Sequence, residues 1–184
     1  MKQLSHLSCR LESLIRLLAK NLECKEIAKL AISITEMQTS TTVNVCPGFD
    51  DYGKICGTKG VMINALTRLY ELIGARNSRR VRLVLDKAQD GKITDRPEFK
   101  VREDWNNKAI RELAETVCAL IFGEFKVNAS DNGQSTTLEI VFARGDKMKT
   151  NQPVIEESLS VILKSVGKAQ GRTQIFVDLA EGDV

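Results

Sequence analysis

Hydrophobic positions in the first half of the chain change their spacing from one segment to the next, and each spacing predicts an element. Apolar side chains at every third or fourth position indicate an amphipathic helix after Ser8, which is suited to cap it. Strict alternation indicates two strands joined around Gln38 and Thr39, and Gly74 is expected to end a later helix. The predicted elements are a helix over 9–23, strands around 32–34 and 43–45, a helical turn over 51–56, a helix over 61–73 and a strand over 81–85.

The second half is predicted to repeat this order of helix, strand, strand, short helix, helix and strand. Asp104 is suited to cap a helix that extends to about residue 122, and residues 131–133 (Asp-Asn-Gly) are a strong signal for a hairpin turn. Pro153 suits the first turn of a helix, Gly167 its end, and residues 175–177 a final strand. We therefore expect the same elements in both halves.

A repeat in the sequence itself supports two copies of one unit. Residues 40–45 (STTVNV) recur as residues 135–140 (STTLEI), at an offset of 95. The same offset relates Ile15, Leu18 and Leu22 to Ile110, Leu113 and Val117. An offset of 93 relates Met62, Leu66, Leu69, Tyr70, Ile73 and Gly74 to Ile155, Leu159, Ile162, Leu163, Val166 and Gly167. The change of offset falls where the first copy has a glycine-rich turn.

These patterns predict an α+β fold of two tandem units, each a three-stranded sheet with its helices on one face. The first unit is expected to span residues 1–88 and the second residues 104–184. Residues 89–103, which contain Asp90, Gly91 and Pro97, are predicted to be a linker because turn-forming residues cluster there.

The composition is that of a folded protein. With 184 residues, of which 42% are hydrophobic and 28% charged, the chain can bury one substantial core or two small ones. No apolar run approaches the roughly 20 residues of a membrane span, so we expect a cytoplasmic protein without membrane contact. The five cysteines are odd in number and form no Cys-x-x-Cys pair, which favours reduced thiols in the core.

Charge is distributed unevenly along the chain. The net charge of +3 is too small by itself to indicate a nucleic-acid partner. Residues 1–86 contain 13 Lys and Arg against 8 Asp and Glu, a balance of +5, whereas residues 87–184 contain 14 against 16, a balance of −2. The cationic half is the one that contains the glycine-rich turn.

That turn, Gly57-Thr58-Lys59-Gly60, interrupts a helical pattern. Each glycine disfavours a helix by roughly 1 kcal/mol relative to alanine, so the helix should break here. Without side chains at Gly57 and Gly60, a phosphodiester backbone can approach the main chain, while Lys59 supplies charge. The amides of Gly60 and Val61 are expected to point outward as donors at the positive end of the next helix. These features indicate a clamp for a nucleic-acid backbone.

In this order of elements, the motif over residues 53–60 (GKICGTKG), followed by an apolar helix with Ala65-Leu66, resembles a type II KH domain. It is most similar to the small bacterial single-KH RNA-binding proteins, although Cys56 stands where isoleucine is more usual. The resemblance covers roughly residues 8–86. It is much weaker over 104–184, where residues 145–153 hold no paired glycines, so the second unit is expected to be a degenerate KH-like copy.

The resemblance implies a non-catalytic protein that binds single-stranded RNA, as an RNA chaperone or a regulator of small-RNA or ribosome-associated processes. The sequence does not distinguish single-stranded RNA from single-stranded DNA as the bound polymer. No cofactor or metal is implied, and the second unit could serve a homodimer or a protein partner. The residues expected to contact nucleic acid are Gly53, Lys54, Ile55, Gly57, Thr58, Lys59, Gly60, Val61, Ile63, Arg79 and Arg80, with Met62 in the same apolar groove and Arg76 and Arg82 extending the basic track.

Other interpretations stay open from the sequence. The glycine-rich turn could join two helices without a ligand, and both units could form a protein-interaction or dimerisation scaffold with little or no RNA binding. An enzyme is least favoured, because His6 has no second imidazole as a partner. Asp50 and Asp51 are better suited to cap the short helix than to act as a catalytic pair.

Overall fold

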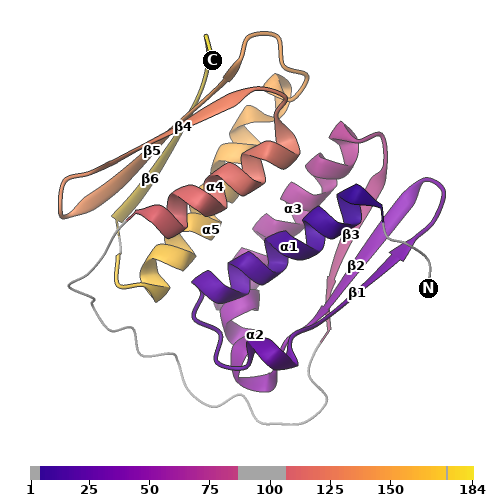
Figure 1. Cartoon of the computed structure of the whole chain (residues 1–184). Coiled ribbons are helices and arrows are strands. Elements are labelled where there is room, and N and C mark those ends of the chain that lie inside the picture. Colours follow the sequence, from indigo (N-terminus) through magenta and orange to yellow (C-terminus); the bar gives the residue numbers. More distant parts are fainter. Residues whose placement is uncertain (1–4, 87–106, 173) are drawn as a thin grey trace. The chain divides into compact units, whose positions relative to one another are not determined.

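The computed structural model describes residues 5–86, 107–172 and 174–184 (Figure 1). The chain divides between residues 98 and 99 into two compact units, called unit 1 and unit 2 below. Each combines helices with a three-stranded mixed sheet, so the predicted α+β class is confirmed. The predicted linker and the predicted cap Asp104 lie outside the described residues.

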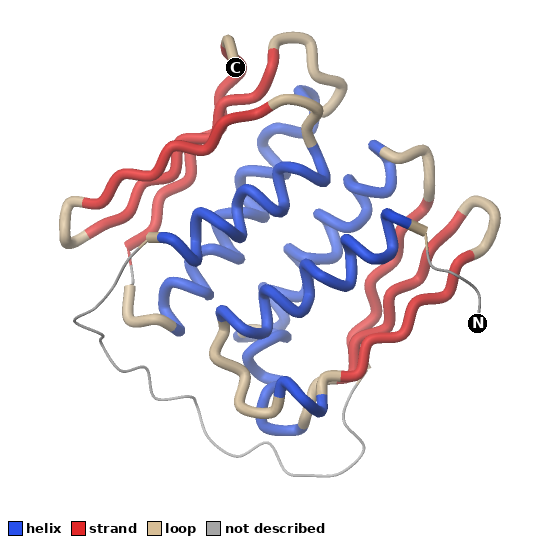
Figure 2. Tube along the Cα trace, viewed as in Figure 1, coloured by secondary structure: helices blue, strands red, loops and turns tan. Residues whose placement is uncertain are grey.

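Unit 1 consists of a helix, a hairpin, two further helices and a last strand. Its elements are α1 (His6–Asn21), β1 (Ala31–Glu36), β2 (Ser40–Cys46), α2 (Phe49–Cys56), α3 (Val61–Arg76) and β3 (Arg80–Leu85). The strand order is β1-β2-β3, with β1 antiparallel and β3 parallel to the middle strand β2. Figure 2 shows α1 and α3 on one side of this sheet, as the sequence predicts.

The hydrophobic core of unit 1 lies between these two helices and the inner face of the sheet. β2 alternates strictly, so Val43 and Val45 are buried while Thr42, Asn44 and Cys46 face outward. The Tyr70 hydroxyl of α3 donates a hydrogen bond of 2.8 Å to the Leu11 carbonyl of α1, and burial raises the pKa of this phenol. A buried hydrogen bond therefore joins α1 to α3 in addition to apolar packing.

The first helix begins earlier than predicted. Ser5 is its N-cap, and the Ser5 hydroxyl accepts a hydrogen bond of 3.3 Å from the Ser8 amide. The prediction that Ser8 caps the helix was wrong, because Ser8 is buried inside α1 and its hydroxyl donates to Glu36 of β1. Hydrogen bonds from both serine hydroxyls lower the pKa of the Glu36 carboxyl.

Gly74 lies inside α3 and does not end it, so the predicted helix stop was wrong. A Cβ on Gly74 would lie 2.5 Å from the Arg79 carbonyl oxygen and 2.7 Å from the Val81 nitrogen. The missing side chain therefore lets the helix approach the start of β3 closely. Gly167 occupies the same place in unit 2, inside α5, where a Cβ would lie 3.0 Å from the Arg172 carbonyl oxygen.

Unit 2 repeats the sheet and the two long helices of unit 1. Its elements are α4 (Lys108–Ile121), β4 (Phe125–Asp131), β5 (Ser135–Ala143), α5 (Gln152–Ala169) and β6 (Gln174–Gly182). The strand order is β4-β5-β6, again with an antiparallel hairpin and a parallel last strand. The predicted hairpin turn is confirmed, with the Gly133 amide donating to Asp131 Oδ1 at 2.7 Å.

The short helix predicted for the second half is absent from the described residues between β5 and α5. A 3₁₀ turn over Lys149–Asn151 takes its place, directly before α5. Pro153 lies in the first turn of α5, as predicted. Unit 2 therefore lacks both the counterpart of α2 and the glycine-rich loop that follows it.

Both units fasten the start of their last strand to their hairpin through an arginine. Arg79 Nη2 donates to the Met37 carbonyl at 2.6 Å and to the Ser40 carbonyl at 3.1 Å. In unit 2, at the offset of 93, Arg172 Nη2 donates to both carboxylate oxygens of Asp131 at 2.8 Å. The two units therefore share this arginine contact beyond Gly74 and Gly167, the last positions of the repeat predicted from the sequence.

The free cysteines fulfil the predicted core role only in part. Cys24 and Cys118 are buried, and burial raises the pKa of each thiol to about 12. Cys9 is exposed, so the prediction was wrong there, and Cys46 and Cys56 are half-buried. None of the helices in the described residues has the length and apolar character of a membrane span.

Candidate nucleic-acid interface

The loop between α2 and α3 has a backbone that glycine favours. Gly57 has a φ of 75° and Gly60 a φ of 76°, and Lys59 between them has a φ of 55°. Left-handed backbone is readily adopted by glycine but strained for lysine. The loop turns tightly at residues 58–60 and directs the Thr58 and Lys59 side chains into solvent.

The amides of this loop are used differently from the prediction. The Gly60 amide donates to the Gly57 carbonyl at 3.1 Å, and the Val61 amide donates to the Thr58 carbonyl. These two amides therefore hold the turn together and are not outward donors for a phosphate. The positive end of α3 still faces the loop, and its first turn contains no acidic side chain.

The two glycines have different surroundings. A Cβ on Gly57 would lie 2.7 Å from the Met62 Cβ, so this glycine lets the loop fold against α3. At Gly60 the nearest atom to a Cβ would be Ile63 Cγ2 at 3.8 Å, which leaves open space beside the main chain. The accessible part of the loop is therefore Thr58, Lys59 and Gly60.

Lys59 is the cation that the loop presents to solvent. Its side chain is exposed and has no hydrogen-bond or ion-pair partner within the described residues. Val61, the next side chain along, is 51% exposed, and Ile63 is half-buried. A positive charge thus lies beside a small apolar surface at the start of α3.

Lys54 and Ile55, which the sequence assigned to the interface, belong to the structural support of the loop. Lys54 Nζ lies 3.4 Å from Asp51 Oδ1 and donates to the Glu23 carbonyl, and its side chain is 16% exposed. Ile55 and Met62 are each 1% exposed and form part of the core. The predictions that Lys54 neutralises a phosphate and that Ile55 and Met62 line a base groove were wrong.

Asp51 anchors α2 to the segment after α1. Its carboxylate, 2% exposed, accepts hydrogen bonds from the Lys25 amide at 2.8 Å and from the Glu26 amide at 2.7 Å. The prediction that Asp51 caps its own helix was wrong, because Gly48 is the N-cap of α2. Asp51 and Lys54 therefore hold the base of the loop in place.

Arg79 and Arg80 are not brought to the loop. They follow the C-terminal end of α3, a helix of 16 residues that is about 24 Å long at 1.5 Å per residue. Arg79 is bound to the hairpin carbonyls, and Arg80 projects from β3. Among the aromatic residues of unit 1, Tyr70 is fully buried and Phe49 and Tyr52 are half-buried, so none is fully exposed for base stacking.

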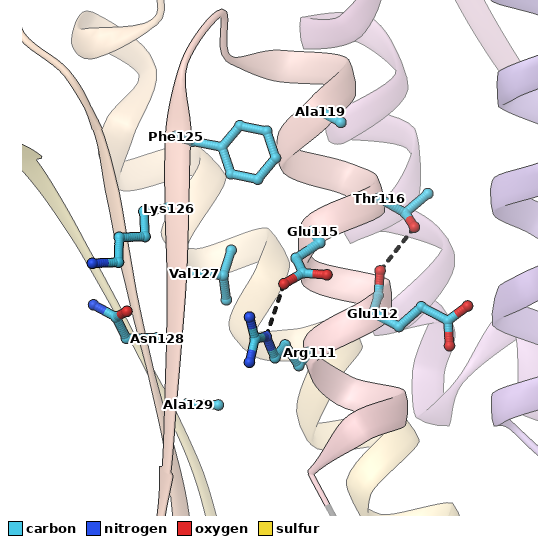
Figure 3. Close-up of a pocket in the computed structure, with 10 residues that line it drawn as sticks. All are labelled: Arg111, Glu112, Glu115, Thr116, Ala119, Phe125, Lys126, Val127, Asn128 and Ala129. Carbon is cyan, nitrogen blue, oxygen red and sulfur yellow. Dashed lines mark hydrogen bonds and ion pairs between the residues drawn. The ribbon is translucent and has the colours of Figure 1, made fainter. Parts of the chain in front are cut away.

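A second candidate site is a groove of about 730 Å³ in unit 2, between α4 and β4. Figure 3 shows Arg111 and Glu115, one turn apart on α4, forming an ion pair along one wall of the groove, with an Nε to Oε1 distance of 2.8 Å. The lining residues are Arg111, Glu112, Glu115, Thr116, Ala119, Phe125, Lys126, Val127, Asn128 and Ala129. Both signs of charge line this groove, so it has no preference for a polyanion.

Comparison with known protein families and with curated proteins finds no match to this sequence. The class that the structure defines is an α+β protein of two related units with mixed three-stranded sheets. Within the part of the chain that is described, no cluster of three or more His, Cys, Asp or Glu could hold a metal ion. The glycine-rich loop of unit 1 is therefore the candidate site with the most specific geometry.

The strained backbone of Lys59 gives a test of its role. Lys59→Gly is expected to raise the free energy of unfolding by about 0.5–1 kcal/mol, because relief of roughly 1–2 kcal/mol of strain exceeds the added flexibility of the unfolded chain. The RNA binding that the sequence predicts for this loop should fall about fivefold at 0.1 M salt, because one phosphate contact is lost. Urea unfolding and fluorescence anisotropy measure the two effects. Lys59→Ala, which removes the charge without relieving the backbone, should weaken binding without the gain in stability.

Proposed function

We propose that unit 1 is a KH-like module that binds single-stranded RNA at the Gly57–Gly60 loop, without catalysis. The observation that carries the proposal is the exposed Lys59, held in a left-handed backbone beside the open face of Gly60 at the start of α3. The order helix, strand, strand, helix, loop, helix, strand of unit 1 supports the same proposal. A turn that only joined two helices would not require a charged residue in a strained conformation.

In this proposal the sugar-phosphate backbone lies against Thr58, Lys59 and Gly60. Lys59 neutralises a phosphate, the positive end of α3 stabilises the same charge, and bases rest on Val61 and Ile63. With one cation at the loop, the logarithm of the binding constant should fall by about 0.7 for each tenfold rise in salt. Without fully exposed aromatic residues at the loop, sequence discrimination should be weak, which suits an RNA chaperone or a regulator of small-RNA or ribosome-associated processes.

Unit 2 is inferred to be a degenerate copy of the same module. The segment that precedes α5 contains a 3₁₀ turn and Pro153 where unit 1 has α2 and its loop. Proline has no amide hydrogen and the segment has no paired glycines, so a backbone clamp of the unit 1 kind cannot form there.

A protein-interaction scaffold is the second candidate. The observation that favours it is the groove between α4 and β4, because β4 is an edge strand with an unpaired side. An edge strand beside a partly apolar groove suits a peptide or a second copy of the chain. This role belongs to unit 2 and is compatible with RNA binding by unit 1.

Replacing the accessible side chains of the loop tests the RNA proposal directly. Thr58→Asp with Lys59→Asp is expected to lower affinity for a short single-stranded RNA by at least about 25-fold at 0.1 M salt. One phosphate contact is lost and two anions are placed against the backbone. Fluorescence anisotropy measures binding, and circular dichroism with a melting curve should show an unchanged fold.

The matched control is Lys147→Asp with Thr150→Asp. These exposed residues lie in the segment of unit 2 that replaces the loop, and the change in net charge is the same. The control should bind RNA with at most a small general loss. Equal loss in both double variants, or normal binding by the loop variant, would contradict the proposal.

A further inference from the structure

The outer face of the unit 1 sheet has a positive charge that is separate from the loop. β3 alternates, so Arg80 and Arg82 are exposed on the face opposite the helices, while Val81 and Leu83 between and beyond them are buried. Neither guanidinium group has a hydrogen-bond or ion-pair partner within the described part of the chain. Two residues along a strand span about 6.7 Å, which is close to the separation of successive phosphates in an extended strand.

The neighbours of these arginines are polar and uncharged. Arg80 is paired in register with Ser40, and Arg82 with Thr42 of β2. The other outward residues of the sheet are Ala31, Ser33, Thr35, Asn44, Cys46 and Val84. None of the residues within the three strands projects an acidic side chain from this face. The exposed Asp86, which follows β3 in the same alternation, is four residues beyond Arg82. Hydroxyl and amide groups are therefore the polar neighbours of the two guanidinium groups within the sheet.

Unit 2 provides an internal comparison, because its sheet is the same in topology but different in charge. At the places of Arg80 and Arg82 in the register, β6 has Gln174 and Phe176. Glu139 and Asp178 are paired on the outward face of the same sheet. The three strands of unit 2 also have inward apolar residues but carry no arginine on their outer face. The cationic face is therefore a property of unit 1 and is not required by the fold.

We propose that the outer face of the β1-β2-β3 sheet is a second RNA contact surface, in which Arg80 and Arg82 bind successive phosphates. Guanidinium groups match phosphate oxygens in geometry and charge, and the hydroxyl of Thr42 and the amide of Asn44 supply further donors. The inference deepens the proposed function and rests on it for the choice of RNA as the polymer. The surface itself is separate from the loop, which lies at the other end of α3.

The sheet face also explains how a module with one loop cation could bind a longer RNA. A KH-type site holds about four nucleotides, so a strand of about 20 nucleotides has enough length to reach both surfaces. Two added phosphate contacts raise the salt slope by about 1.4 and the affinity by about 25-fold at 0.1 M salt. The sheet face is thus expected to contribute more to the salt dependence than the loop does.

The test is Arg80→Gln with Arg82→Gln in the full chain, assayed by anisotropy with a fluorescent RNA of about 20 nucleotides over a range of salt. The expected result is an affinity about 25-fold lower at 0.1 M salt and a salt slope lower by about 1.4, with an unchanged circular dichroism spectrum. Arg80→Lys with Arg82→Lys keeps the charge and should retain most of the salt slope. Lys164→Gln with Lys168→Gln removes the same net charge from exposed positions on α5 and should leave the slope unchanged.

The outcomes separate this inference from the proposed function. Normal binding by the Arg80 and Arg82 variant, together with loss in the loop variant, overturns the sheet surface and leaves the loop proposal standing. Loss of binding in the arginine variant, together with normal binding by the loop variant, overturns the loop proposal and supports the sheet surface. Arginine-dependent binding to vesicles of anionic lipid without binding to RNA would overturn the sheet surface as an RNA site.

Discussion

Gly74→Ala is expected to lower the free energy of unfolding of unit 1 by about 2–3 kcal/mol. The added Cβ would lie 2.5 Å from the Arg79 carbonyl oxygen and 2.7 Å from the Val81 nitrogen, and these main-chain atoms cannot rotate away. Overpacking of this kind costs more than the roughly 1 kcal/mol that alanine gains over glycine inside a helix. For a unit of this size the melting temperature should fall by about 10–20 °C.

The matched control is Gly53→Ala in α2. Nothing lies within 4 Å of a Cβ at Gly53, and its φ is not in the left-handed region. Alanine there should raise stability by about 0.5–1 kcal/mol, because only the helix preference changes. Thermal unfolding followed by circular dichroism compares the two variants. If both changed stability in the same direction and by the same amount, the close approach of α3 to β3 would not be the reason for Gly74.

Asp51→Ala is expected to destabilise unit 1 by about 3 kcal/mol or more. The substitution removes the acceptor of the Lys25 and Glu26 amides and leaves the mostly buried ammonium of Lys54 without its counter-charge. Loss of one partner from a buried ion pair is costly because the other charge stays desolvated. RNA binding should also weaken, since α2 carries the loop at its C-terminal end.

Urea unfolding measures this loss, and Asp50→Ala is the matched control. Asp50 is the neighbouring residue in the first turn of α2 but is exposed, so its removal should change stability by less than about 0.5 kcal/mol. A similar small effect of both substitutions would show that the hydrogen bonds of Asp51 do not hold the loop base together.

The strands and the long helices could be predicted from the sequence because each has a local signal, whereas the short helix predicted for the second half is absent. The alternation in residues 40–45 and its recurrence at 135–140 predicted the middle strands, and both lie at the centre of a sheet. Helix ends were less predictable. In the sequence, Gly74 and Gly167 are typical of helix ends. In the structure, glycine is required at both positions because the helix packs closely against the start of the strand that follows it.

The candidate site could be predicted only in part, for a similar reason. The turn at residues 57–60 can be predicted from its glycines. The ion pair of Lys54 with Asp51 and its hydrogen bond to the Glu23 carbonyl depend on the tertiary position of α1 and the segment that follows it. Arg79 looks like a free cation in the sequence, yet its guanidinium binds main-chain carbonyls of the hairpin. The alternation of residues 80–85 predicts a strand after α3, with Arg80 and Arg82 on its outward face. This pattern could have shown that the two arginines do not lie at the loop.

The parallel pairing of β2 with β3, and of β5 with β6, determines when each unit can be completed during synthesis. The middle strand of unit 1 receives its second partner only after residue 85 has left the ribosome, and that of unit 2 only after residue 182. Until then the nascent chain holds an unfinished sheet with an open strand side. A chaperone that shields such an edge would be needed in each unit for about the same length of synthesis, from the end of the middle strand to the end of the last strand.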